Sequence, residues 1–212
     1  MPPQPTIQIG RLLRAGMTGF VAGCRVSQVD APSFGALVRA PLTPSSAVFG
    51  LIYDIRIEDD GLVKQLVTAE SVDEHVIADN RINRNVPIEM SILAVGYRES
   101  GRIYHLLPPR PPLSLDTLYL CDEAEIRAFT GTERLGYLRF ILQAQDAPTG
   151  ELLAAHIKQA ATAHPDPAAW KEAATQEIIA LLRDDYASLM SILSALAEVQ
   201  TYPISHSKRE QP

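Results

Sequence analysis

The sequence predicts an α+β protein in which a small antiparallel β-barrel in the N-terminal half precedes a C-terminal α-helical domain. Up to residue 121, short segments rich in β-branched and aromatic residues alternate with Gly and Pro, and no amphipathic helix lies between them. This pattern favours a barrel over a βαβ sheet. From Asp122 onward, helix-capping residues and helically spaced apolar residues take over. We therefore expect a barrel domain over 1–121, a helical domain over 122–200 and a disordered tail over 201–212.

The first three strands are predicted from apolar runs that end at turn-forming residues. Residues 9–24 predict one strand and a turn, and residues 35–40 predict a second strand that ends at Pro41. The third segment, 47–57, begins as an almost unbroken apolar run and continues as apolar–polar alternation. Such a strand is typically buried on both faces at one end and on one face at the other. Four glycines of the first segment supply bends for a tightly curved sheet: Gly10, Gly16, Gly19 and Gly23.

The next part of the barrel is predicted to contain a hairpin. Three acidic residues and a glycine over 58–61 end the third strand in a turn, and 62–70 suits either a helical turn or a strand. Polar residues over 80–85 predict a long excursion from the sheet. Strands over 88–97 and 102–107 flank a four-residue turn that contains Gly.

A proline-rich strap follows the hairpin. Residues 108–112 include four prolines, which can join neither a helix nor a central strand and therefore require an extended chain. We expect the strap to cross the barrel and to deliver residues 113–121 as its closing strand. A ligand for proline-recognising modules is the alternative interpretation.

Helices are predicted after residue 121. Their expected ranges are 123–129, 133–145, 150–163 and one long helix from 167 onward. The expected N-terminal caps are Asp122 with Glu125, Thr130 with Glu133, Thr149 alone, and Asp166 before Pro167.

The last predicted helix carries a heptad-like apolar seam. Its residues alternate spacings of three and four, namely Ile179, Leu182, Tyr186, Leu189, Leu193 and Leu196. Four further apolar residues widen this face: Ile178, Leu181, Ile192 and Val199. So wide an apolar face must be buried, either within the chain or against a second copy, and both alternatives stay open.

Charge and composition narrow the function classes. The net charge of −6 argues against a general nucleic-acid coat. The first 39 residues nevertheless hold four arginines against one acidic residue, so a candidate anion or nucleic-acid surface consists of Arg11, Arg14, Arg25 and Arg39. Ordinary solvated surface is the other interpretation of these arginines. Two cysteines, no signal peptide and no apolar run long enough to span a membrane predict a soluble, cytoplasmic protein.

The search for catalytic motifs gives none. The sequence lacks a P-loop, a dinucleotide-binding fingerprint, a nucleophile elbow and an H-E-x-x-H motif. The five histidines are scattered, and we expect His156 and His164 to lie on the surface of a helix rather than to bind a metal. The sequence therefore predicts no catalytic residue, no cofactor and no metal site.

One family resemblance spans residues 7–121. The order of a glycine-rich first strand, a short second strand, the run Val48–Tyr53 and a proline strap ahead of Leu118–Leu120 resembles the HAS barrel. HerA-type DNA-translocating ATPases and the subunits of rotary ATP synthases share this barrel. There it precedes a RecA-like motor and forms a ring-shaped collar that guides assembly or docks a partner. This chain departs from the family after residue 121, where helix-forming residues replace the motor, so the resemblance implies neither ATPase activity nor catalytic residues.

These observations lead to two hypotheses about function. The first is a non-catalytic barrel adaptor or assembly protein that docks a partner protein, for example a separately encoded HerA-type ATPase or nuclease. The second is a small-barrel nucleic-acid-binding protein that uses the basic N-terminal segment, with Phe20 or Phe34 as stacking platforms. An enzyme of unrecognised type stays open as well. Because HAS barrels work in rings or at joints between subunits, the resemblance also favours a homo-oligomer.

Overall fold

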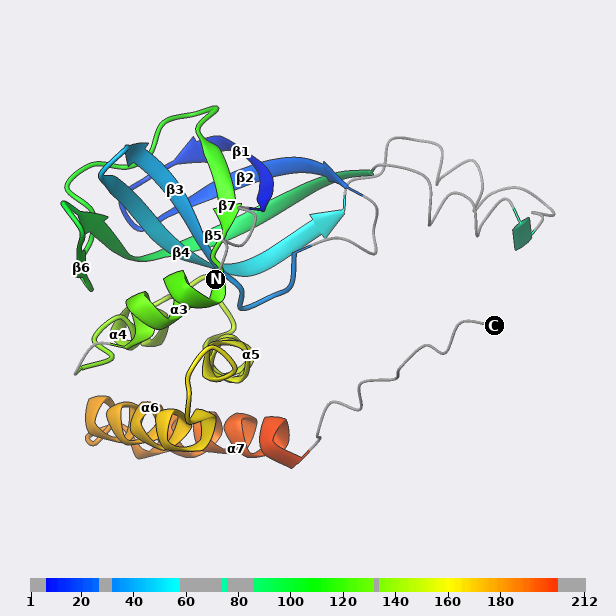
Figure 1. Ribbon diagram of the computed structural model, residues 1–212. Helices are drawn as coiled ribbons and strands as arrows, with labels where there is room; N and C mark the ends of the chain where they lie inside the picture. Colours follow the sequence, from blue (N-terminus) through cyan, green and yellow to red (C-terminus); the bar gives the residue numbers. More distant parts are fainter. Residues whose placement is uncertain (1–6, 27–31, 58–73, 76–85, 132–133, 202–212) are drawn as a thin grey trace.

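Six strands close into an antiparallel barrel, and five helices lie on one side of it (Figure 1). The computed structural model describes residues 7–26, 32–57, 74–75, 86–131 and 134–201. The strand order is β2-β1-β7-β3-β4-β5, and pairing of β2 with β5 closes the ring. The strands are β1 (Gln8–Ala15), β2 (Gly19–Val26), β3 (Leu37–Thr43), β4 (Ser46–Ile57), β5 (Val86–Glu99) and β7 (Thr117–Leu120), while β6 (Arg102–Tyr104) extends the hairpin from β5. The predicted α+β fold, with a barrel before helices, is confirmed.

The prediction of one strand over residues 9–24 is wrong, because this segment forms two. β1 and β2 pair antiparallel, with Leu12 opposite Ala22 and a bulge between Leu12 and Arg14. The turn between them is closed by a hydrogen bond from the Gly16 amide to the Gly19 carbonyl at 2.8 Å. The glycines serve a hairpin turn rather than bends in a single strand.

β3 runs through Pro41 instead of ending before it. The proline pairs with Ala47 of β4, whereas the pairing of β3 with β7 covers only Val38 and Arg39. Pro41 is tolerated because it lies where β3 has one neighbouring strand, so its missing amide hydrogen breaks no ladder. The predicted third strand is confirmed as β4.

The hairpin and the closing strand are also confirmed. Ser100 and Gly101 adopt φ values of +48° and +79° between β5 and β6, the backbone twist that a two-residue hairpin turn requires. β6 ends at Tyr104, earlier than expected. The chain then passes through residues 106–116, which are called the strap from here on and include the four prolines. It continues into β7, which pairs with β1 and with β3. The predictions for 58–61, 62–70, 80–85 and 202–212 lie outside the described residues.

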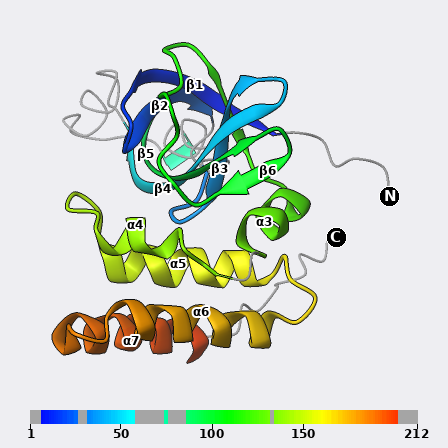
Figure 2. The ribbon, with the colours of Figure 1, turned by 90° about the vertical axis from the view of Figure 1, so that its left-hand side faces the viewer.

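The helices form two layers under the barrel, as the end-on view in Figure 2 shows. They are α3 (Glu123–Thr130), α4 (Leu138–Leu142), α5 (Thr149–Ala161), α6 (Pro167–Leu181) and α7 (Tyr186–Thr201). α5 packs on α6 and α7, which make up the outer layer. Apolar side chains fill two cores, one inside the barrel and one between the barrel and the helices. No helix within the described ranges is long and apolar enough to cross a membrane.

Two of the four predicted helix caps are present. Asp122 and Glu125 form the reciprocal capping box of α3, and the Asp166 side chain accepts hydrogen bonds from the first amides of α6. Thr130 instead ends α3, where its hydroxyl donates to the Ile126 carbonyl. Thr149 is already inside α5, and its hydroxyl donates to carbonyls that precede the helix.

The single long C-terminal helix that was predicted is in fact two helices. α6 ends at Leu181 and α7 begins at Tyr186. The cause is local: the Asp185 side chain accepts a hydrogen bond from the Ser188 amide at 3.1 Å, which caps a new helix and competes with continuation of the old one. The apolar spacing of three and four therefore continues across a turn.

Candidate functional site

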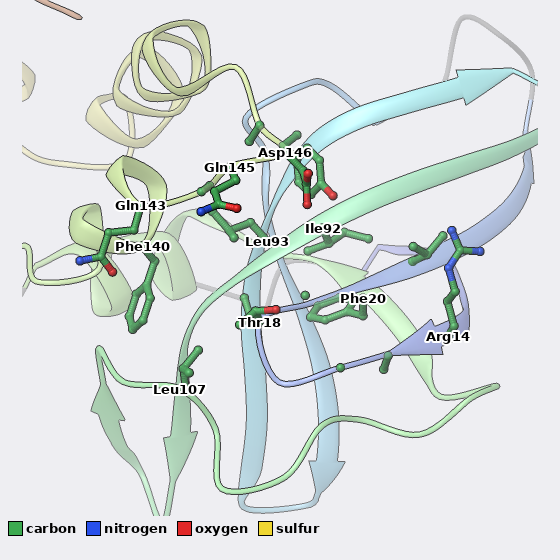
Figure 3. Close-up of a pocket in the computed structure, with 18 residues that line it drawn as sticks. Arg14, Thr18, Phe20, Ile92, Leu93, Leu107, Phe140, Gln143, Gln145 and Asp146 are labelled. Atoms are coloured by element: carbon green, nitrogen blue, oxygen red, sulfur yellow. The ribbon is translucent and has the colours of Figure 1, made fainter. Parts of the chain in front are cut away.

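A cleft of about 630 Å³ opens where the barrel meets the helices (Figure 3). It lies between the β1–β2 turn, the middle of β5 and the connection from α4 to α5. Apolar side chains line it from both sides: Phe20, Ile92 and Leu93 from the barrel, Leu107 from the strap and Phe140 from α4. Polar side chains add hydrogen-bonding groups: Arg14, Thr18, Gln143, Gln145 and Asp146.

The cleft forms where the β2–β5 ladder ends. Gly19, the first residue of β2, pairs with Leu93 of β5 at this end of the ladder. Just before it, the Thr18 carbonyl accepts a hydrogen bond from the Ala94 amide at 2.9 Å. A Cβ at Gly19 would lie 2.6 Å from the Ile92 carbonyl oxygen, so only glycine permits this close approach. β2 begins at Gly19, so the part of β5 after Ala94 has no partner in β2, and residues of the α4–α5 connection line one side of the opening.

The chemistry of the cleft suits binding. Amide, hydroxyl and carboxylate groups surround an apolar floor. Such a cleft can bury an apolar group of a ligand and orient the polar part of the same ligand by hydrogen bonds. Arg14 is committed elsewhere, because its Nη2 lies 3.1 Å from Glu89 Oε1 on the outer barrel surface. Within the described ranges, no group of three or more His, Cys, Asp or Glu side chains could hold a metal ion.

Large exposed apolar side chains are concentrated on β1, on the β1–β2 turn and on the strap. Six of the eleven found in the described part of the chain lie on β1, on the β1–β2 turn or on the strap: Leu13, Met17, Leu106, Leu107, Leu113 and Leu115. Leu113 and Leu115 are each 70% exposed. Buried apolar surface is the main source of association free energy, so clustered exposed leucines indicate an interaction site.

Three of the four arginines of the predicted basic surface have contacts within the chain. Arg11 donates to the Leu115 carbonyl at 2.9 Å, and Arg14 pairs with Glu89. Arg39 lies 2.5 Å from Glu125 Oε1 as an ion pair outside hydrogen-bond geometry, and its guanidinium covers the Tyr119 ring at 4.7 Å.

The nucleic-acid hypothesis also involves Arg25, Phe20 and Phe34. Arg25 lies on β2 opposite Pro87. Phe20 is buried inside the barrel, and Phe34 packs against the core between the barrel and the helices. Base stacking needs an open ring face, which the buried Phe20 does not offer. Phe34 is partly exposed, so its role as a stacking platform stays a prediction.

The six seam residues also have different environments. Leu196 is buried, and Leu182, Leu189 and Leu193 pack partly buried against the same core. Tyr186 is 74% exposed, and Ile179 is partly buried. Most of the seam therefore contacts the chain's own helices, while Leu181, Tyr186 and Met190 remain as exposed apolar side chains on the outer layer.

The prediction of surface histidines is wrong for His156, which is buried. Its ring contacts Tyr137 as part of a chain of rings that runs through His105 and Phe129 to Phe49 in β4. Burial lowers the pKa of His156 to about 4. His164 is partly buried and stacks on Trp170. Because the Thr130 hydroxyl donates to the Ile126 carbonyl, His164 Nε2 donates to that hydroxyl. The spacing of the histidines in the sequence could not predict these contacts, because the contacting residues belong to other segments of the chain.

Comparison with known proteins identifies no family. No protein-family model matches the chain, and no curated protein sequence matches it.

Proposed function

We propose that this chain is a non-catalytic adaptor that binds another protein through its barrel. The observation that carries the proposal is that six exposed apolar side chains lie on β1, on the β1–β2 turn and on the strap. The strap is hydrogen-bonded to β1, and the turn and Leu107 border an apolar-floored cleft. A patch of this kind, with polar groups at its margin, has the composition of a protein-binding surface.

The HAS-like order of sequence features suggests a class of partner. In that family the barrel docks or collars a motor, and this chain contains no P-loop of its own. A separately encoded HerA-type DNA-translocating ATPase or nuclease is therefore the partner we propose to test first. The adaptor itself should neither hydrolyse ATP nor bind it at micromolar concentration.

The test is capture of the tagged full-length chain from its own cells, followed by reconstitution. A captured protein is purified separately, mixed with the chain and examined by light scattering for a complex of defined stoichiometry. The matched control is a Tyr186→Ser, Met190→Ser variant, which changes exposed apolar residues far from the barrel. A stoichiometric complex that this variant also forms supports the adaptor. Absence of any reconstituted complex, or calorimetry with one salt-resistant ATP per chain, would overturn it.

A further inference from the structure

Three exposed leucines form one patch on the barrel. Leu13 of β1 is 50% exposed, and Leu113 and Leu115 of the strap are 70% exposed. Hydrogen bonds place the strap directly beside β1: the Leu115 amide donates to the Leu12 carbonyl at 2.8 Å, and the Ser114 hydroxyl donates to the Leu13 carbonyl at 3.2 Å. In both ribbon views the part of the chain that leads into β7 lies on the side of the barrel away from the helices (Figures 1 and 2).

The patch is held in a fixed and strained conformation. Leu115 has φ +71°, a left-handed value that side chains such as leucine rarely adopt. Besides the bonds to β1, the Asp116 carboxylate accepts from the Leu113 amide at 2.8 Å, and Arg11 donates to the Leu115 carbonyl. Strain that the surroundings maintain is characteristic of functional sites.

The charge around the patch is opposite to that of the whole protein. Arg11 of β1 and Arg110 of the strap are exposed, whereas Arg14 is paired with Glu89. Asp116 is the acidic residue of the strap, and its carboxylate accepts a hydrogen bond from the neutral Leu113 amide. The margin of the patch therefore holds two arginines against one aspartate. The chain as a whole carries −6, so a positive margin around an apolar centre selects for a partner with acidic side chains beside apolar ones.

We propose that the patch of Leu13, Leu113 and Leu115 docks an apolar segment of a partner protein that carries acidic side chains at its flanks. This inference rests on the proposed adaptor function and specifies its partner. An anionic membrane is the other surface with this chemistry. The strap over 106–116 contains no Trp, Tyr or Phe, the residues that anchor proteins at membrane interfaces, so a protein segment is the occupant that we propose.

The probe is a fluorescein-labelled amphipathic peptide of about 18 residues with a leucine face flanked by glutamates. Two matched peptides carry lysine in place of glutamate, or serine in place of leucine. Anisotropy is measured with the full-length chain, with Leu113→Ser, Leu115→Ser, with Arg110→Glu and with the control Tyr186→Ser, Met190→Ser. We expect the glutamate–leucine peptide to bind best, to bind about tenfold more weakly to the first two variants, and to bind the control unchanged. Raised salt should weaken binding.

Several results would overturn the inference. These are equal binding of the lysine peptide, equal binding to the leucine variant, or retention by phosphatidylserine vesicles that the leucine variant abolishes. Circular dichroism establishes that each variant is folded. If a reconstituted partner binds wild type and the leucine variant equally, the adaptor stands and this patch is not its docking site. If no partner forms a complex with wild type, the adaptor function itself fails.

Discussion

The Tyr137 hydroxyl lies 2.9 Å from Nε2 of His156, and both side chains are buried between the barrel and the helices. The other ring nitrogen, Nδ1, lies 3.2 Å from the Gly35 carbonyl oxygen. A carbonyl can only accept, so Nδ1 carries the proton and Nε2 accepts from the tyrosine. One neutral histidine of α5 therefore joins the α3–α4 connection to the loop that precedes β3.

This histidine predicts loss of stability at acid pH. Its pKa falls from 6.5 to about 4 on folding, so between these values the unfolded chain binds a proton that the folded chain does not. Stability is therefore retained above about pH 6.5 and lost as the pH falls toward 4, by about 3 kcal/mol from this residue. Burial also lowers the pKa values of His105 and His164, which act in the same direction.

The measurement is urea denaturation across this pH range for wild type and His156→Gln. An amide can donate to Gly35 and accept from Tyr137 but does not titrate, so the variant should show a shallower pH dependence. The matched control is His75→Gln, at an exposed histidine. Parallel pH profiles for wild type and His156→Gln would contradict the assignment.

The position of Gly50 in the barrel leaves no space for a side chain. A Cβ at this position would clash with Ile92 Cγ2 and lie 2.9 Å from the Leu93 carbonyl oxygen. Gly50→Val should therefore destabilise the protein by about 1–3 kcal/mol, and Gly50→Ala should already do so in part. The control is Gly16→Ala, whose Cβ would meet nothing closer than 3.6 Å. An unchanged denaturation midpoint for Gly50→Val would contradict the close approach.

The C-terminal seam predicts different outcomes for its inner and outer residues. Leu189 and Leu193 pack against the chain's own core, so Leu189→Glu with Leu193→Glu buries two unpaired charges and should unfold the helical half. Tyr186→Lys with Met190→Lys changes exposed residues and should leave helix content intact. Circular dichroism and light scattering separate the outcomes.

The second pair of substitutions tests self-association directly. If the wild type is an oligomer that pairs through the outer layer, the lysine variant should be a folded monomer. A folded monomer from the glutamate variant would instead mean that Leu189 and Leu193 face a second copy.

The Arg39–Glu125 pair predicts measurable coupling between the barrel and α3. Both side chains are mostly buried, with 14% and 19% of their surface exposed. We expect a double-mutant cycle with Arg39→Gln and Glu125→Gln to give a coupling free energy of about 1–2 kcal/mol. The control cycle is Arg14 with Glu89, where the arginine is 68% exposed and the expected value is below about 1 kcal/mol. Equal coupling in both cycles would contradict a structural role for Arg39.

The sequence by itself determined the elements whose causes are local. Alternation and apolar runs predicted β4 and β5, the Ser100–Gly101 turn predicted the hairpin, and Asp122 and Asp166 predicted where α3 and α6 begin. Each of these depends on neighbours within about four residues of the chain, which a sequence pattern can represent.

Only the tertiary structure decided which distant residues meet. Arg39 reads as surface charge until Glu125 and Tyr119 cover it, and His156 reads as a surface histidine until Tyr137 and Gly35 satisfy both its nitrogens. The exposed leucines of the strap look like an ordinary apolar stretch until β7 enters the barrel between β1 and β3 and leaves them outside. Burial is a property of contacts between elements far apart in sequence, and local spacing carries no information about those contacts.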